Sequence, residues 1–269
     1  MMSTEIEEKK ELKGNENNPL TGAELVNPYS EGAAKGEQVE RMFDSIAPAY
    51  DFMNTAMTFG LHRLWRNRAL KMAKRISPDP KEILDIATGT GDLAFRLSEI
   101  YPKAKVTGLD LSQGMLDIAE EKLRNQPEEV RNRIRFMQGD SLDMKFADNS
   151  FDLITVAYGV RNFEHLRQGL SEMFRVLRPG GALCIIELSV PRNPMLKFGY
   201  NLYSRHIIPF VGRMVSGDSR AYTYLPESIA AAPQRDDLSA ILSECGFSKN
   251  AWRSLTLGAV TYYFAIKPR

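Results

Sequence analysis

Hydrophobic and polar positions alternate with two different periods along most of the chain. From residue 82 onward, short apolar runs predict strands, and between them apolar residues recur every three or four positions, which predicts amphipathic helices. This order of strand and helix indicates a parallel sheet covered by helices on both faces. The expected strands are 83–87, 105–110, 134–138, 152–157, 182–187, 251–257 and 260–267, and the expected helices among them are 92–100, 113–125, 164–177 and 235–245.

The N-terminal part of the chain has a different pattern. Residues 37–54 and 60–75 carry helical spacing, and we expect them to form a helical lid, 37–75, beside the sheet. Residues 1–36 begin with a polar, charged stretch that is typical of a disordered tail. The remainder, 37–269, is therefore predicted to be one domain.

Composition and charge narrow the function. Lysine and arginine number 35 against 34 acidic residues, so no overall basic field attracts nucleic acid, and we expect no nucleic-acid partner. The three histidines and two cysteines lack the spacing of a metal site, so no metal is expected. No apolar stretch reaches the roughly 20 residues that span a bilayer. Since the N-terminus also lacks the pattern of a targeting segment, we expect a cytoplasmic protein.

The stretch LDIATGTGDLAFRL, residues 84–97, ends a predicted strand, turns on glycines and opens a predicted helix. Such a turn presents bare backbone N–H groups to a ligand. Gly89, Thr90 and Gly91 fit the looser form of the dinucleotide-binding fingerprint, and Asp110, at the end of the next strand, would bind a ribose. This pattern leaves two cofactors open, NAD and S-adenosylmethionine.

The charges around the turn favour S-adenosylmethionine. Asp85 lies just before the turn and Asp92 just after it, so a pyrophosphate would meet two carboxylates. S-adenosylmethionine carries an ammonium and a sulfonium, which carboxylates attract, although Asp92 could equally complement only the helix dipole. Asp140 and Ser141 follow the third strand, from where they can reach the adenine edge.

Two longer signatures carry a resemblance to a known family. They are YDFMNTAMTFGLHRLW at 50–65 and RVLRPGGALCIIELS at 175–189. With them the chain resembles class I S-adenosylmethionine-dependent methyltransferases, and within that group the menaquinone/ubiquinone biosynthesis C-methyltransferases, from about residue 38 to the end. Thr58 stands where that family usually has serine, and Arg178 where it usually has lysine.

The resemblance implies a fold, a cofactor and a substrate. The fold is a Rossmann-like α/β domain with a seven-stranded, mostly parallel sheet. The substrate is a prenylated quinol methylated on a ring carbon, a naphthoquinol of the menaquinone series by preference. A ubiquinone-precursor benzoquinol or another small lipid or phenol stays open, as does an NAD-linked oxidoreductase. The expected cofactor contacts, from pattern and resemblance together, are Asp85, Gly89, Thr90, Gly91, Asp110, Leu111, Asp140, Ser141 and Ala157.

Arg161 and Asn162 are the first candidates for catalysis because they follow the fourth strand. Methylation of a quinol carbon needs an adjacent hydroxyl that loses its proton. Arg161 remains protonated, so we expect it to lower the pKa of that phenol and to position a water that accepts the proton, with Asn162 holding the water or a quinol oxygen. The structural alternative is an ion pair of Arg161 with Glu164 or Asp152.

Tyr50 is the third candidate, from the lid. It could close over the methyl end of the cofactor or place its hydroxyl on the quinol, and the alternative is an aromatic contact between two helices. His62 and Trp65 lie on one helical face and are expected to pack within the lid, with His62 as an alternative proton acceptor.

Residues 192–230 form an insertion whose first part, 192–216, is both apolar and cationic. Such a segment suits peripheral contact with the anionic inner face of a membrane, or it could wall the groove for an isoprenoid tail. The alternatives are a core helix or a homodimer contact. The residues that carry this expectation are Met195, Leu196, Lys197, Phe198, Tyr200, Leu202, Tyr203, Arg205, Ile207, Ile208, Phe210, Val211, Arg213 and Met214.

Overall fold

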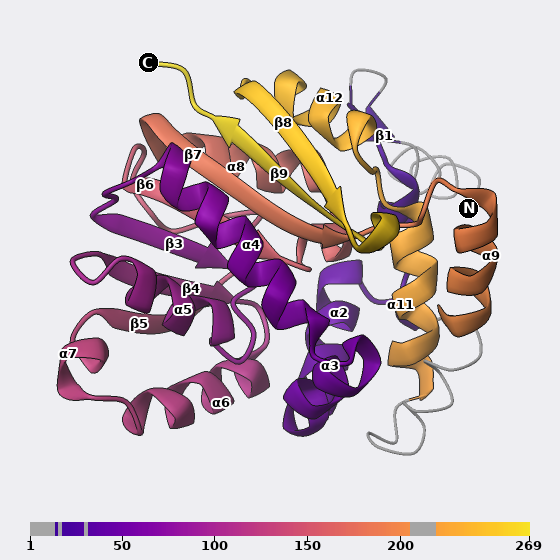
Figure 1. The fold of residues 1–269 in the computed structure, drawn as a ribbon, viewed down its shortest axis with the longest axis horizontal. Coiled ribbons are helices and arrows are strands. Elements are labelled where there is room, and N and C mark those ends of the chain that lie inside the picture. Colours follow the sequence, from indigo (N-terminus) through magenta and orange to yellow (C-terminus); the bar gives the residue numbers. More distant parts are fainter. Residues whose placement is uncertain (1–13, 16–17, 30–31, 205–218) are drawn as a thin grey trace, which may run out of the picture.

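A seven-stranded sheet forms the centre of the protein (Figure 1). The computed structural model describes residues 14–15, 18–29, 32–204 and 219–269. The strand order is β5-β4-β3-β6-β7-β9-β8, and β9 runs antiparallel to both of its neighbours while the other strands share one direction. The predicted fold class is confirmed. The strands are β3 Glu82–Ile86, β4 Lys105–Asp110, β5 Ile134–Gln138, β6 Phe151–Ala157, β7 Leu177–Leu188, β8 Ser248–Leu255 and β9 Val260–Ile266, with a small hairpin of β1 Gly14–Asn15 and β2 Asn18–Pro19 apart from the sheet.

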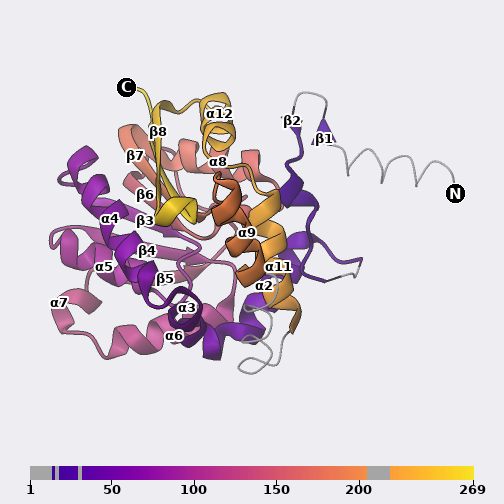
Figure 2. The same ribbon diagram turned by 45° about the vertical axis from the view of Figure 1, so that its right-hand side comes forward.

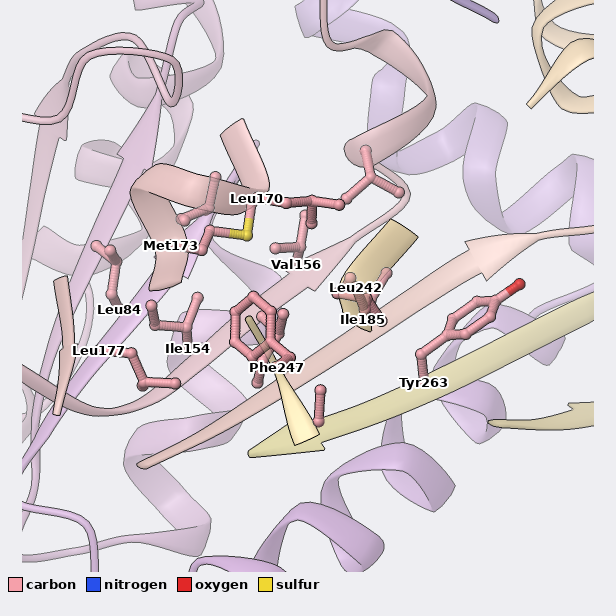
Figure 3. Packing of buried hydrophobic residues seen from close by; sticks show 14 of the residues in the cluster. Leu84, Ile154, Val156, Leu170, Met173, Leu177, Ile185, Leu242, Phe247 and Tyr263 are labelled. Carbon is pink, nitrogen blue, oxygen red and sulfur yellow. The ribbon is translucent and has the colours of Figure 1, made fainter. Parts of the chain in front are cut away.

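Helices cover both faces of the sheet. On one face, α8 and α12 bury Leu170, Met173 and Leu242 against strand residues such as Ile154 (Figure 3). On the other face, α4 and α5 pack against the strands. The helices are α2 Lys35–Ile46, α3 Tyr50–Thr58, α4 Leu61–Ile76, α5 Asp92–Ile100, α6 Gln113–Arg124, α7 Glu128–Arg131, α8 Leu166–Val176, α9 Pro194–Leu202, α11 Ser219–Ala231 and α12 Asp236–Glu244, with short 3-10 turns η1 Gly22–Leu25, η2 Ala47–Ala49, η3 Val160–Asn162 and η5 Thr256–Gly258.

Strand β7 begins earlier than the pattern predicts. Leu177 pairs with Phe151, and the next pair is Ala182 with Leu153, so the chain bulges between them. The sequence RPGG of this bulge is typical of a turn, and the prediction accordingly placed the strand start at 182. Pairing with β6 on both sides of the bulge joins the two pieces into one strand.

The predicted helical lid divides into two parts with different roles. In α4, Ala69, Leu70 and Ala73 are fully buried against the sheet, so this helix is part of the sheet's cover and not a lid. Small side chains at two of these positions let the helix approach the strands closely. The residues of α2 and α3 instead form a separate core with Tyr222 and Tyr224 of α11. Figures 1 and 2 show α9 alongside α11 at this end of the molecule.

Within the described residues, no helix combines the length and apolar character that crossing a bilayer requires.

Candidate active site

The glycine turn between β3 and α5 is held in a conformation that other residues rarely adopt. Gly89 and Gly91 have positive φ angles of 57° and 81°. A Cβ on Gly91 would lie 2.7 Å from the ring of Phe136, so both sterics and backbone conformation require glycine there. The backbone N–H of Gly89 donates to Asp110 Oδ2 at 2.7 Å. The turn is thereby attached to the carboxyl end of β4.

A cleft runs along the carboxyl ends of β3, β4, β5 and β6, which is where open α/β sheets bind ligands. Burial raises the pKa of Asp110 to about 6, although its carboxylate accepts hydrogen bonds from the backbone of Ser112 and Gly89. This acidic cleft brings most of the predicted site together. The predicted residues that line it are Tyr50, Gly89, Asp110, Leu111, Asp140, Ser141, Ala157 and Asn162.

Asp85 and Thr90 lie beside the acidic cleft, in a small polar recess behind the glycine turn. Asp85 is fully buried, and its two oxygens accept from the hydroxyls of Thr88 at 2.7 Å and Thr155 at 2.6 Å. Burial raises its pKa to about 6. Thr90 donates its hydroxyl to Asp51 at 2.6 Å. These side chains therefore bond to other protein groups and hold the turn in place. The backbone of the turn, and not these side chains, is then available to bind a ligand.

Asp92, expected to repel a phosphate at the turn, is instead neutralised by neighbouring cations. Asp92 forms ion pairs with Arg66 at 3.0 Å and Lys122 at 2.9 Å, and these cations hold the pKa of its carboxyl low. Its negative charge is offset within the protein, so it does not bias the turn against a phosphate. As the first residue of α5 it also complements the helix dipole.

Other acids take over that electrostatic role. The acidic cleft is lined by Glu40, Asp110, Asp140 and Glu164, and no lysine or arginine of the described residues lines it. A polyanionic dinucleotide would meet these carboxylates without a compensating cation, whereas a cationic ligand would be attracted. The geometry therefore favours a sulfonium cofactor. Of the four acids, Asp110 and Asp140 were predicted from the sequence as cofactor contacts, but Glu40 and Glu164 were not.

A second cavity of about 330 Å³ opens next to the cleft. It lies among α2, α3, α4, α9 and α11, and its wall is mostly apolar. Phe43, Tyr50 and Tyr158 line both this apolar cavity and the acidic cleft. A lipid-like substrate in one and a cofactor in the other would thus meet at these rings. A groove for an isoprenoid tail was one predicted role of segment 192–216, and Tyr200 and Tyr203 of that segment line this cavity. The rest of the wall was not predicted, because it comes from parts of the chain that lie far apart in the sequence.

Arg161 lines the apolar cavity and forms a buried ion pair. Its Nη1 lies 2.8 Å from Glu187 Oε1, and both side chains are less than 10% exposed. The predicted alternative partners, Glu164 and Asp152, are wrong. Glu187 ends the apolar run of β7, which is the same signal that identified Asp110 at the end of β4. Sequence reasoning could therefore have found it.

Asn162 lines the acidic cleft, and Tyr50 lines both the cleft and the apolar cavity. Asn162 Oδ1 accepts from the hydroxyl of Tyr224 at 3.1 Å. Tyr50 makes an edge contact with Phe43, with ring centroids 6.2 Å apart, and burial raises the pKa of its hydroxyl. The predicted aromatic contact between two helices is therefore present, and because Tyr50 also lines both cavities, its predicted role toward cofactor or quinol stays a prediction.

Tyr158, which the sequence analysis did not single out, lines both the acidic cleft and the apolar cavity. Its φ of 62° is unusual for a residue with a side chain, and such strain concentrates at functional sites. Its backbone carbonyl accepts from the side chain of Arg161. Among the described residues its buried hydroxyl has no hydrogen-bond partner. A buried, unpartnered donor at the junction of two cavities points to a ligand group there.

Comparison with known proteins identifies the family. Residues 32–267 match the ubiE/COQ5 methyltransferase family. A demethylmenaquinone methyltransferase of Porphyromonas gingivalis is 49% identical over 92% of this chain and 100% of its own length, and one of Bacteroides fragilis is 43% identical over 91% and 98%. The fold is similar to that of phosphoethanolamine N-methyltransferase 2 of Haemonchus contortus, with a TM-score of 0.56 and 18% identity over 76% of this chain and 53% of that one. The chain therefore belongs to the ubiE/COQ5 methyltransferase family.

Proposed function

We propose that the protein transfers a methyl group from S-adenosylmethionine to a ring carbon of a prenylated quinol, demethylmenaquinol, to give menaquinol. The observation that carries this proposal is the pair of cavities, one acidic and one apolar, that share Phe43, Tyr50 and Tyr158. The names of the relatives from Porphyromonas gingivalis and Bacteroides fragilis support the naphthoquinol over a benzoquinol.

The acidic cleft fits S-adenosylmethionine. Asp110 ends β4, 21 residues after Gly89, where a carboxylate accepts from ribose hydroxyls, and Asp140 and Ser141 lie near the place for the adenine. When bound, the cofactor supplies an electrophilic methyl group on a sulfonium, and the ring carbon that takes it loses its own proton. The described lining of the cleft holds no cation that would accept the pyrophosphate of NAD, so the oxidoreductase alternative is disfavoured.

Arg161 and Asn162 are assigned to the activation of the quinol. The Arg161 guanidinium stays charged because the neighbouring Glu187 raises its pKa. From the wall of the apolar cavity this charge stabilises a phenolate, which makes the adjacent ring carbon electron-rich. Asn162, held by Tyr224, can orient a water that takes the phenol proton. Tyr50 covers the junction and excludes bulk water from it.

Exposed apolar side chains near the apolar cavity suggest where the substrate enters. Phe59 and Leu61 belong to the cavity wall, and Phe59 is 83% exposed. On α9, Met195 and Phe198 are 82% and 74% exposed. Such exposed apolar side chains, on the cavity wall and on a helix that contributes Tyr200 to it, fit peripheral contact with a membrane that holds the quinol. The predicted contact residues Arg205, Ile207, Ile208, Phe210, Val211, Arg213 and Met214 lie outside the described residues.

The function is tested by offering purified protein isotope-labelled S-adenosylmethionine with short-tailed demethylmenaquinol or the corresponding demethylated benzoquinol under anaerobic conditions. We expect labelled C-methyl product from the naphthoquinol. Faster labelling of the benzoquinol would overturn the substrate assignment. Thermal stabilisation by NAD and not by S-adenosylmethionine would overturn the whole proposal.

A further inference from the structure

His62 lies in the first turn of α4 and is 4% exposed. It lines both the apolar cavity and the polar recess, so it stands between the place for a lipid substrate and the glycine turn. Burial, helped by the charges of Arg66 and Arg63, lowers the pKa of its imidazole to about 4. The ring is therefore neutral at physiological pH, with one nitrogen protonated and the other bare.

Thr58 decides which nitrogen of His62 carries the hydrogen. The Thr58 hydroxyl lies 2.6 Å from the carbonyl oxygen of Asn54, which can only accept, so the hydroxyl hydrogen is donated there. The same Thr58 Oγ1 lies 2.7 Å from His62 Nδ1. Because the hydroxyl has no second hydrogen, Nδ1–H must donate to it. Nε2 is consequently the bare nitrogen, a hydrogen-bond acceptor.

Other polar groups on the wall of the apolar cavity are either paired or able to donate. Tyr203 donates to a backbone carbonyl at 2.6 Å, and Tyr224 donates to a side-chain amide. Arg161 Nε and the Tyr158 hydroxyl have no partner among the described residues, and both can donate. In the described part of the chain, nothing donates to His62 Nε2. The cavity therefore offers a ligand free donors, among them Arg161 Nε and the Tyr158 hydroxyl, and at His62 Nε2 a free group that can only accept.

We propose that His62 Nε2 accepts a hydrogen bond from one hydroxyl of the quinol and thereby makes the site select the reduced quinol over the oxidised quinone. This inference rests on the function proposed above. The hydroxyl beside the methylated carbon becomes the phenolate, and the donors Arg161 and Tyr158 suit its oxygen. The hydroxyl para to it keeps its hydrogen and can give it to His62.

An oxidised quinone cannot make that hydrogen bond. Its carbonyl oxygen would place a lone pair against the lone pair of Nε2 in a buried site, and the acceptor would stay unsatisfied. Sites built to bind a substrate hydroxyl reject analogues that lack it. Rejection is useful to the enzyme, because a quinone is too electron-poor to take the methyl group and would only occupy the cavity.

The kinetic test compares His62→Phe with the wild type. The measured quantity is the ratio of the inhibition constant of the oxidised quinone to the KM of the quinol. We expect His62→Phe to lower this ratio about tenfold or more, with the KM for S-adenosylmethionine unchanged. His165→Phe is the matched control, because His165 is exposed and lines neither cavity. A wild-type enzyme that methylates no quinol would refute the proposed function, whereas an active enzyme whose ratio is insensitive to His62→Phe would refute only this inference.

The tautomer gives a second test that does not depend on a folded His62 variant. The ¹⁵N spectrum of protein labelled at its three histidines is expected to show His62 protonated at Nδ1 and bare at Nε2. Thr58→Val removes the acceptor for Nδ1–H and should let the hydrogen move to Nε2. Nε2–H would then donate to the oxidised quinone, so the quinone should inhibit more tightly. Thr58→Ser keeps the hydroxyl and should keep the wild-type ratio of the quinone inhibition constant to the quinol KM. Protonation at Nε2 in the wild type, or a raised KM for the cofactor alone in His62→Phe, would overturn the inference.

Discussion

Arg161→Met leaves Glu187 as a buried carboxylate with no cation beside it. The two side chains are 8% and 4% exposed and lie 2.8 Å apart, so water does not screen the loss. Removing one partner of such a pair costs about 3–5 kcal/mol of folding free energy, whereas replacing both by apolar groups is close to neutral. We therefore expect Arg161→Met to lower the urea midpoint of unfolding and Arg161→Met/Glu187→Leu to recover most of the loss.

Catalysis should not recover with stability in the double variant. If the guanidinium of Arg161 stabilises the phenolate, both variants lack that charge, and we expect methyl transfer to slow at least about a hundredfold, or about 2.7 kcal/mol of barrier. Cofactor affinity, measured by calorimetric titration, should hold because Arg161 does not line the acidic cleft. A stable double variant that binds cofactor and loses less than about tenfold in kcat would show that the pair is only structural.

Three further predictions concern the turn, a buried acid and the surface. Gly91→Ala should lower the unfolding free energy by about 2 kcal/mol or more, because Gly91 has a positive φ and a Cβ there would contact the ring of Phe136. Gly199→Ala is the control and should not lower it, because the space around Gly199 is open. Equal losses in the two variants would contradict this prediction. Asp85 alone should add about 2 kcal/mol to the unfolding free energy of the wild type between pH 7 and pH 4, because the pKa of its carboxyl is about 6 when folded and near 4 when unfolded, so the folded state binds the proton first. Urea unfolding at both pH values should show that gain reduced in Asp85→Asn, and an unchanged profile would refute the shift. Phe59→Ser should weaken co-sedimentation of the protein with anionic vesicles, whereas Ile76→Ser, at the far end of α4, should not. Weaker sedimentation in both variants, or in neither, would refute the proposed membrane contact.

The strands could be predicted from the sequence because the sheet is covered on both faces. Strands such as β3 and β6 are mostly apolar and have no exposed position, and helical periods separate them, so the pattern contains their boundaries. The start of β7 could not be predicted in this way. At Pro179 the chain could either interrupt the strand or bulge within it. The pairing with β6 decides between the two, and the local sequence pattern does not contain that pairing.

The partners of charged residues were harder to predict than the positions of strands. Asp92 is paired by Arg66 from α4 and Lys122 from α6, helices that lie on either side of it in the sequence. Arg161 meets Glu187 and not its sequence neighbour Glu164. An ion pair depends on how elements pack and on side-chain direction, and neither follows from the spacing of charges along the chain.

The cofactor was nevertheless inferred correctly from a partly wrong set of acids, and the topology explains why. Parallel strands bring their carboxyl ends to one edge, so an acid that ends or follows any of them is carried to the same site. Asp110 ends β4, Asp140 follows β5, and Glu187 lies one residue before the end of β7. Asp92 instead lies on a helix, where neighbouring cations could reach it. Acids at strand ends are thus a better guide to this edge than acids nearest the glycine turn.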